Sequence, residues 1–200
     1  HLNMVGLCER LSDHQAKPAT NAPRERMWRV RASQVVLAQG AIEKPLVFAG
    51  NDRPGVMLAS AARTYLNRYG VKVGNQAVVV TSHDSAWLAA FDLAVAGVKI
   101  PAIIDVRSNV ADSLINRAKM LGIETLTGWT VTDTGGRHRV SSVRANPVSN
   151  GSVGAARTIA CDVLLMSGGW NPSVHLFSHT KGSLVWDEAR QIYLPGERTE

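Results

Sequence analysis

Two glycine turns follow apolar stretches of the chain, and their residue types suit the binding of a nucleotide. Residues 34–38 form a short apolar run that predicts a buried parallel strand, and the run leads into the turn at residues 38–41. A second apolar run, residues 158–167, ends in Gly168 and Gly169. Glycine lets bare backbone approach a ligand at the carboxyl edge of an open α/β sheet, where nucleotides bind. Ordinary strand termination also favours glycine, so the hypothesis depends on the two turns together.

Two pairs of residues that include histidine could carry chemistry of a different kind. His83 and Asp84 are adjacent in a turn and could form an acid–base pair. The alternative, which we favour, is that Ser82 or Asp84 caps the following helix while His83 is solvated. His175 and His179 have the i, i+4 spacing of metal ligands on a helix, but no third ligand is evident, and structural roles are favoured. The sequence therefore predicts neither a catalytic residue nor a metal site.

A third turn, Thr81 to Ala86, occupies the position of a phosphate-binding loop but contains no glycine. Such loops carry G-x-G-x-x-G because the glycines permit a tight turn and close approach of the pyrophosphate. Asp84 would also place a carboxylate where phosphates should bind. Asp105 ends the next strand, about where an acid binds ribose, although such an acid is also common as a capping or solvated residue. We predict a nucleotide-binding fold that has lost its nucleotide.

The elements around these turns have the order of a dinucleotide-binding fold. Strands are predicted at residues 76–81, 99–105 and 123–126, and helices at 86–96 and 110–121. This βαβαβ order implies a parallel sheet with right-handed crossovers. Further elements are expected before and after it, namely strands at 2–12 and 27–38, a helix at 57–69, a strand pair in 129–145 and a buried strand at 158–167. The fold class is therefore α/β, with a Rossmann-like domain inserted into an outer domain of the FAD/NAD(P)-binding type.

Composition excludes several classes of protein. The net charge of +6 is spread along the chain, and its densest cluster, Arg137 to Arg139, lies in a predicted hairpin, so a nucleic-acid partner is disfavoured. No apolar run approaches the roughly 20 residues of a membrane-spanning helix. Cys8 and Cys161 lie far apart and form no C-x-x-C motif, and a reducing, cytoplasmic setting is expected.

Two longer blocks identify a family. Residues 35–71 (VVLAQGAIEKPLVFAGNDRPGVMLASAARTYLNRYGV) and 161–189 (CDVLLMSGGWNPSVHLFSHTKGSLVWDEA) resemble the alpha subunit of heterotetrameric sarcosine oxidase. The similarity covers nearly the whole chain and weakens around residues 106–155. Related subunits of opine oxidases and of hydrogen cyanide synthase share the architecture but are less similar.

The resemblance implies an activity, cofactors and partners for the parent protein. That family demethylates sarcosine oxidatively to glycine, produces hydrogen peroxide and passes the one-carbon unit to tetrahydrofolate. FAD and FMN would be held mainly through a partner subunit, and the beta, gamma and delta subunits would complete a heterotetramer. The outer domain of the alpha subunit would carry NAD. This chain would then be an internal fragment, inactive alone, that supplies scaffold and part of an NAD site.

The resemblance also assigns domains and site residues. Outer-domain pieces are expected at 1–50 and 157–200, a connecting turn and helix at 51–73, and the inserted domain at 74–156. The residues expected beside the cofactor are Ala38, Gln39, Gly40, Ala41, Gly168 and Gly169. Gln39 departs from the family, where threonine is usual. The principal glycine-rich turn would precede His1, and a folate-binding domain would follow Glu200. An exposed apolar sheet edge and poor solubility are expected of the fragment.

Overall fold

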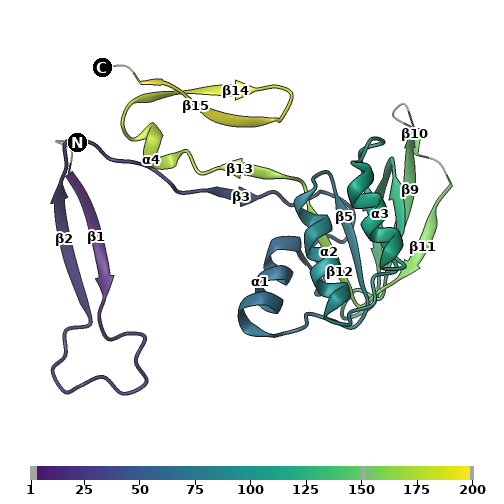
Figure 1. Cartoon of the computed structure of the whole chain (residues 1–200), viewed down its shortest axis with the longest axis horizontal. Helices are drawn as coiled ribbons and strands as arrows, with labels where there is room; N and C mark the ends of the chain where they lie inside the picture. The colour runs from purple at the N-terminus through teal and green to yellow at the C-terminus, as the bar shows by residue number, and fades with distance from the viewer. Residues whose placement is uncertain (1–3, 150–151, 154, 199–200) are drawn as a thin grey trace. The chain divides into compact units, whose positions relative to one another are not determined.

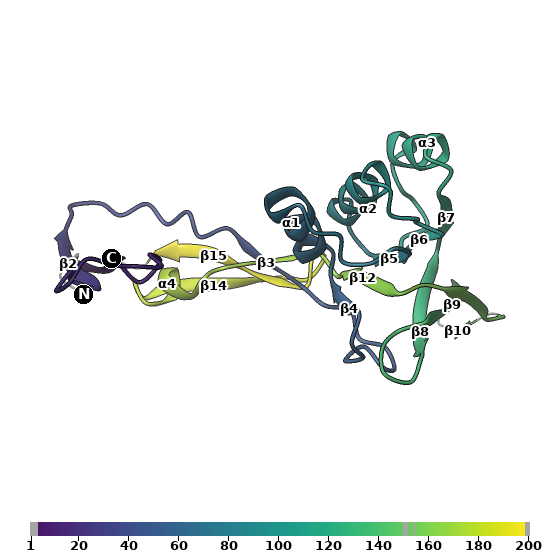
Figure 2. The same cartoon turned by 90° about the horizontal axis from the view of Figure 1, so that it is seen from below.

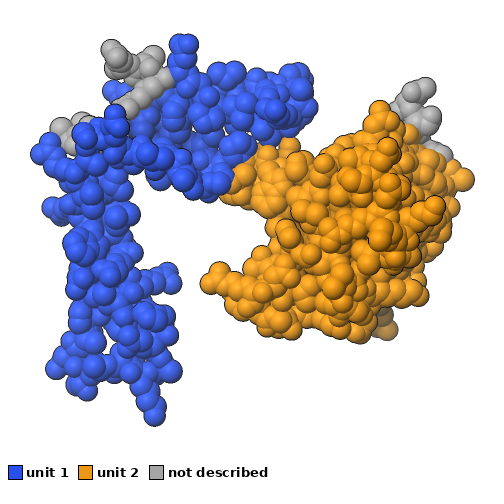
Figure 3. Space-filling model, viewed as in Figure 1, with its two compact units in different colours: residues 1–40, 172–200 blue, residues 41–171 orange. Residues whose placement is uncertain are grey.

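The computed structural model describes residues 4–149, 152–153 and 155–198. The chain divides into two compact units, residues 41–171 and residues 1–40 with 172–200 (Figure 3). The four domain segments expected from the sequence remain a proposal for the longer chain.

A five-stranded parallel sheet organises the unit of residues 41–171. Its strands are β4 (Val56–Leu58), β5 (Ala77–Thr81), β6 (Ala102–Asp105), β7 (Glu124–Thr127) and β12 (Val163–Ser167), in the order β4-β12-β5-β6-β7. The helices α1 (Ala59–Tyr69), α2 (Ser85–Val95) and α3 (Asp112–Met120) connect them. The predicted α/β class and the βαβαβ order are confirmed. The sheet also includes β4 and β12, which lie outside residues 74–156.

The parallel sheet is buried on both faces, as its continuous apolar strands require. One face packs against the three helices and the other against an antiparallel sheet (Figure 2). Alternate residues of β5 point to opposite sides, so Val79 belongs to the core under the helices and Val78 and Val80 to the core on the other face. The core under the helices includes Trp87 and Phe91 of α2, both fully buried. The sheet and α2 thus form a rigid base for the turns at the sheet's carboxyl edge.

The antiparallel sheet covers the second face with β8 (Trp129–Gly135), β9 (Ser142–Ser149), β10 (Ser152–Val153) and β11 (Arg157–Ala160). The predicted single strand at 158–167 was wrong, because it is two strands in two sheets. β11 pairs with β9, and β12 pairs with β4 and β5. Asp162 fixes the break, since its carboxylate accepts the backbone N–H groups of Asn75 and Gln76.

Both ends of helix α1 are fixed by identifiable contacts. Its first turn is capped from a distant part of the chain, because the buried carboxylate of Glu43 accepts the N–H of Ser60 at 2.9 Å. Its last turn ends at Gly70, which adopts a left-handed conformation with φ of 65° and donates to Leu66. The predicted helix 57–69 is therefore confirmed apart from its first two residues, which belong to β4.

A short two-stranded ladder links distant parts of the chain. β3 (Ala41–Glu43) pairs with β13 (Trp170–Pro172). Hydrogen bonds from Lys44 N to Gly169 O and from Gly168 N to Lys44 O continue the ladder at one end. The turn at Gly168 is thus held by backbone contacts with the residues that follow β3.

The unit of residues 1–40 and 172–200 consists mainly of two hairpins (Figure 1), and most of its described residues are exposed. One hairpin pairs β1 (Met4–Arg10) with β2 (Glu25–Arg31), and the other pairs β14 (Gly182–Asp187) with β15 (Ile192–Arg198); α4 (His175–Ser178) precedes the second. Many large apolar side chains here are exposed, among them Leu7, Met27, Trp28, Val185 and Tyr193.

The buried strand predicted at residues 34–38 is the main error of the sequence reading. In the described chain, residues 34–40 form no strand and are exposed, with Val36 at 90% exposure. A parallel strand needs a neighbour on which to form its ladder, and no described strand pairs with these residues.

No helix within the described ranges is long and apolar enough to cross a membrane.

Candidate functional site

A row of polar residues crosses the carboxyl edge of the parallel sheet. Ser167 of β12 is level with Thr81 of β5, Thr81 with Asp105 of β6, and Asp105 with Thr127 of β7. Ser167, Thr81 and Asp105 are fully buried, and in-register neighbours point to the same face of a sheet. This edge is where open α/β sheets bind their ligands. The hydrogen bonds that these side chains make therefore bear on whether this edge could hold a ligand.

Thr81 holds the glycine-free turn in place. Its Oγ1 donates to the carbonyl oxygen of His83 at 2.8 Å and accepts the N–H of His83 at 2.9 Å. A nucleotide-binding turn would leave such N–H groups for the phosphates. Here at least one of them is satisfied by the chain itself.

The prediction that Ser82 or Asp84 caps α2 while His83 is solvated is wrong for the Asp84 cap, whereas His83 is exposed as expected. Asp84 is at the N-cap position with helical dihedral angles (φ −63°, ψ −29°), and within the described chain its side chain makes no capping hydrogen bond. Capping requires an extended N-cap residue whose side chain folds back on the next turn. The Asp84 carboxylate instead forms an ion pair with Arg107 at 2.7 Å.

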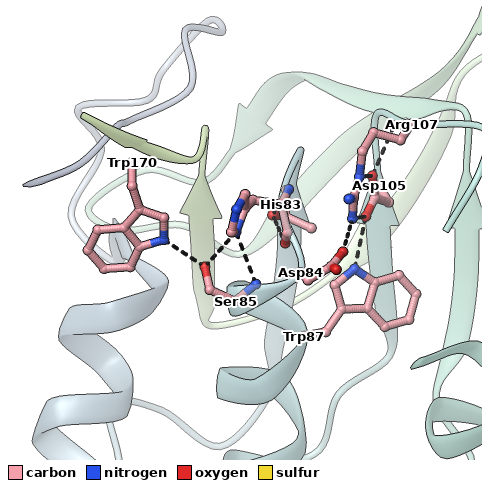
Figure 4. A network of polar contacts seen from close by, with 8 residues as sticks. His83, Asp84, Ser85, Trp87, Asp105, Arg107 and Trp170 are labelled. Carbon is pink, nitrogen blue, oxygen red and sulfur yellow. Dashed lines mark hydrogen bonds and ion pairs between the residues drawn. The ribbon is translucent and has the colours of Figure 1, made fainter. Parts of the chain in front are cut away.

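Asp105 is the centre of this polar edge (Figure 4). Its carboxylate accepts hydrogen bonds from the Nε1–H of Trp87 at 2.9 Å and from the backbone N–H, Nε–H and Nη2–H of Arg107 at 2.9, 3.0 and 2.8 Å. The side-chain hydrogen bonds between Arg107 and Asp105, and after them the one with Asp84, raise the pKa of Arg107. The acid that could have bound ribose is therefore neither a cap nor solvated: it is the buried counter-ion of Arg107.

The residues expected beside a cofactor lie in both compact units. Ala38, Gln39 and Gly40 belong to the exposed segment of one unit, whereas Ala41, Gly168 and Gly169 belong to the other. Gly40 has φ of 69°, and a Cβ atom there would meet nothing within 4 Å among the described residues. Backbone with that much free space can be approached closely by another molecule.

Gly168 differs from Gly40 because the space beside it is filled. A Cβ atom on Gly168 would lie 3.1 Å from the carbonyl oxygen of Pro45 and 3.2 Å from that of Lys44. A side chain at this position would therefore press against residues 44–46. The Gly168 position has a structural explanation that needs no cofactor.

The histidines of the short helix α4 assemble no metal site. His179 N donates to His175 O, which continues the helical turn. Among the described residues, no group of three or more His, Cys, Asp or Glu side chains could hold a metal ion.

Comparison with known proteins identifies the family. No protein-family model matches the chain. The chain is 42% identical over 197 residues to the sarcosine oxidase subunit alpha of Corynebacterium sp. (strain P-1), which covers 96% of this chain and 20% of that protein. It is 40% identical over 195 residues to the corresponding subunit of Rhizobium meliloti (strain 1021), covering 97% of this chain and 19% of that protein.

The chain belongs to the sarcosine oxidase alpha subunit family. It spans about a fifth of the length of the curated relatives it matches.

Solved structures place this member of the sarcosine oxidase alpha subunit family in a wider fold group. A thioredoxin reductase of T. acidophilum matches with a TM-score of 0.65 at 16% identity, covering 88% of this chain and 61% of that one. An L-proline dehydrogenase from P. horikoshii matches with a TM-score of 0.53 at 22% identity, covering 86% and 28%. At these identities the likeness shows the fold alone, and it agrees with the FAD/NAD(P)-binding class expected from the sequence.

The sequence analysis did not identify the arginine that pairs with Asp84 and Asp105 at the carboxyl edge of the parallel sheet. Arg107 was not singled out, although its position two residues after Asp105 was a usable signal, because an arginine beside a strand-end acid readily folds back on it. Trp170 was also missed. Its Nε1–H donates to Ser85 Oγ at 3.0 Å, and both residues line an open groove of about 640 Å³ beside α1.

Proposed function

We propose that this chain is part of the alpha subunit of a sarcosine oxidase complex. The parent enzyme would demethylate sarcosine oxidatively to glycine, reduce oxygen to hydrogen peroxide and transfer the one-carbon unit to tetrahydrofolate. The single observation that carries the proposal is the 42% identity with a sarcosine oxidase alpha subunit over 96% of this chain.

The chain would contribute scaffold and part of a dinucleotide site rather than the amine-oxidising centre. Gly40, with its left-handed backbone and free space, fits one wall of an NAD site. The edge at Asp105 does not fit, because its carboxylate is occupied by Trp87 and Arg107 and no glycine opens the turn before it. A phosphate there would also meet the negative charge of Asp84.

Under this proposal Ala38, Gln39, Gly40, Ala41, Gly168 and Gly169 lie beside NAD. A bound NAD supplies a nicotinamide ring able to accept hydride. The residues of this chain would hold and orient the dinucleotide through backbone groups, and Gln39, with its longer amide side chain, is placed where threonine is usual in the family. FAD and FMN would be held mainly through a partner subunit. This chain would supply no catalytic residue to the flavin sites.

The proposed assembly includes beta, gamma and delta subunits in a cytoplasmic heterotetramer. Neither nucleic acid nor a membrane is among the proposed partners. The fragment alone would be inactive, since the flavins would belong to the rest of the complex.

Two alternatives share the fold. The chain could belong to a subunit of an opine oxidase or another amine oxidase, or to a scaffold subunit that binds NAD without taking part in catalysis. A substrate panel distinguishes the first alternative, because the parent complex would then oxidise an opine or another amine faster than sarcosine.

The deciding experiment compares the complete complex with the beta subunit alone. Sarcosine-dependent peroxide production by the complex that is lost without the alpha subunit supports the proposal. Activity fully retained by beta alone would favour the scaffold, and activity with another amine only would favour the related oxidases.

A pair of glycine variants in the complete alpha subunit tests the NAD assignment. Gly40 and Gly122 have φ of 69° and 67°, and at both positions a Cβ atom would meet nothing within 4 Å in the described chain. Alanine should therefore cost similar stability at each. Gly40→Ala is expected to weaken NAD binding about tenfold or more, because a methyl group would enter the cofactor's space, whereas Gly122→Ala leaves binding unchanged. Equal NAD affinities in the two variants would contradict the assignment.

A further inference from the structure

The polar face of helix α1 lines an open groove within the unit of residues 41–171. Ser60, Arg63, Thr64, Asn67 and Arg68 have the spacing i, i+3, i+4, i+7 and i+8, which places them on one face of the helix. The groove has a volume of about 640 Å³, within the range of about 300 to 1,000 Å³ that is typical of small-molecule sites. A polar helix face is ordinarily solvated, so the rest of the lining decides whether the groove suits a ligand.

The rest of the lining includes an aromatic ring that the chain holds in place. Trp170 of β13 borders the groove together with Ser85 and Ala89 of α2. The indole Nε1–H of Trp170 donates to Ser85 Oγ at 3.0 Å, so one edge of the half-buried ring is fixed (Figure 4). Ala89 contributes only a methyl group. A flat ring beside a few hydrogen-bonding groups is the composition of sites that bind aromatic ligands.

Arg63 offers the groove a positive charge in a fixed position. Its Nε–H donates to Asp92 Oδ2 at 2.6 Å, and Nδ2 of Asn67 donates to the same oxygen at 3.0 Å. The Arg63 side chain is thereby tethered while 44% of it stays exposed. A guanidinium has five N–H donors, and the described bond to Asp92 uses the one on Nε. The Nη groups can therefore pair with a carboxylate or a phosphate.

The other charged groups around the groove also favour an anion. Arg68 adds a second positive charge, with its guanidinium 5.6 Å from the centre of the Tyr69 ring. The Glu43 carboxylate is buried and accepts the N–H of Ser60 in the first turn of α1, where a helix stabilises negative charge. The Asp92 carboxylate is bound to Arg63, as described above. Both carboxylates are thus used within the chain.

We propose that this groove binds a small anionic ligand with a flat aromatic ring. The phosphate or carboxylate of the ligand pairs with the Nη groups of Arg63, Arg68 adds to the attraction, and the ring lies against the indole of Trp170. The lining shares no residue with the proposed NAD site. The inference does not depend on the sarcosine oxidase assignment.

Titration calorimetry on the complete alpha subunit, with NAD in excess to block a dinucleotide site, tests the proposal. The probes are adenosine 5′-monophosphate, which carries a phosphate, and indole-3-acetate, which carries a carboxylate. At least one should bind at a single saturable site, and the tighter probe identifies the anionic group. Its neutral counterpart, adenosine or indole-3-acetamide, should bind about tenfold more weakly or worse, because it lacks the charge-assisted hydrogen bonds to Arg63.

A matched pair of arginine variants tests the charge. Arg63 and Arg157 both form exposed ion pairs, with 44% and 47% of their side chains exposed, but only Arg63 borders the groove. Arg63→Gln should weaken binding of the tighter probe about tenfold or more, whereas Arg157→Gln should leave it unchanged.

Two variants of Trp170 test the aromatic wall. Trp170→Leu should weaken binding of the same probe about fivefold or more, because stacking on the ring is lost. Trp170→Phe keeps a flat ring and should retain most of the affinity. Circular dichroism checks the fold of each variant before titration. If Trp170→Leu fails to fold, the arginine pair and the neutral probe still decide the outcome.

Two outcomes would overturn the proposal. One is the absence of binding by both probes, which would mean that the polar face of α1 is a solvated surface or is covered in the complete subunit. The other is equal weakening by Arg63→Gln and Arg157→Gln, which would mean that the probes respond to the net charge of the chain and not to the groove.

Discussion

Two turns that the sequence marks as possible nucleotide sites differ in whether the chain itself pairs their polar groups. At the carboxyl edge of the parallel sheet, Thr81, Asp105 and Arg107 satisfy the turn with side chains of the chain itself. At residues 34–40 the chain is exposed, no described strand pairs with it, and Gly40 has free space around it. The first turn therefore has polar groups that are paired within the chain, whereas the second leaves free space at Gly40, where we have proposed a dinucleotide.

The largest expected effect is at the satisfied edge. Asp105→Asn would leave Arg107 without its buried counter-ion and would weaken the bond to the buried indole of Trp87. Arg107 keeps its ion pair with Asp84, but several hydrogen bonds to a buried charge are weakened together, and we expect a loss of about 3 kcal/mol. Urea denaturation followed by circular dichroism measures the loss. Glu124→Gln, which breaks the exposed pair with Arg157, is the control and should cost below about 1 kcal/mol. Equal losses in the two variants would show that the edge is not a buried, satisfied network.

The reactivity of the two cysteines should show the same contrast between a buried and an exposed part of the chain. Burial raises the pKa of Cys161 to about 11, so little thiolate exists at neutral pH, whereas Cys8 is exposed. Cys161 should react with a thiol reagent about 100-fold more slowly in the native chain than in urea, and Cys8 within a few-fold of its unfolded rate. Cys-to-Ser variants assign the two rates.

The raised pKa of Cys161 also makes the free energy of unfolding depend on pH. The unfolded thiol ionises first as the pH rises, so the stability linked to this group is complete below its ordinary pKa of 9.0 and is lost towards pH 11. The free energy of unfolding should therefore fall between these pH values, and the fall should be smaller in Cys161→Ala. Rapid native labelling of Cys161 would contradict the buried environment.

Substitutions at Gly168 and Gly122 compare a glycine with close neighbours and a glycine with free space around it. Gly168→Ala would place a methyl group against the carbonyl oxygens of Lys44 and Pro45, and such overpacking costs about 2 kcal/mol. Gly122→Ala, whose methyl group would meet nothing in the described chain, should cost about 1 kcal/mol from its positive φ alone. Thermal unfolding of both variants measures the difference. Gly168→Ala being the milder change would mean that the ladder at residues 44–46 yields easily.

The smallest expected effect is in the open segment. Val36 is 90% exposed, so Val36→Lys should change the free energy of unfolding of this chain by less than about 0.5 kcal/mol and should reduce its self-association. Light scattering and urea denaturation check both. In the complete alpha subunit the same change should be destabilising if residues 34–38 form the predicted buried strand there. A large loss in this chain would instead mean that the segment is already packed.

The βαβαβ unit could be predicted from the sequence because the patterns that mark its helices and strands are local. Alternation, apolar runs and terminal glycines such as Gly70 mark the elements of the βαβαβ unit, and burial on both faces explains the continuous apolar strands. The missing glycine at residues 82–85 led to the prediction that this turn is not a phosphate loop, and in the structure Thr81 Oγ1 accepts the backbone N–H of His83 there. The family followed from longer blocks of sequence rather than from any single motif.

What could not be predicted depends on contacts between distant residues. The pairing of Arg107 with Asp84, the capping of α1 by Glu43 and the division of residues 158–167 between two sheets each need the fold to be known. The strand at 34–38 failed for a related reason, since an apolar run specifies that it should be buried but not which strand will pair with it.

The position of β12 between β4 and β5 has a consequence for biosynthesis. β4 leaves the ribosome with residues 56–58, whereas its neighbour in the sheet emerges only with residues 163–167. β5, β6 and β7 can pair as they appear, but β4 and the face of α1 that packs on the sheet must wait for the last strand. Contacts so distant in sequence slow folding, because the closure of a long loop precedes any gain from pairing. A nascent chain arrested before residue 163 would therefore expose the apolar face of α1, and chaperones that recognise such surfaces would be expected to bind it during translation.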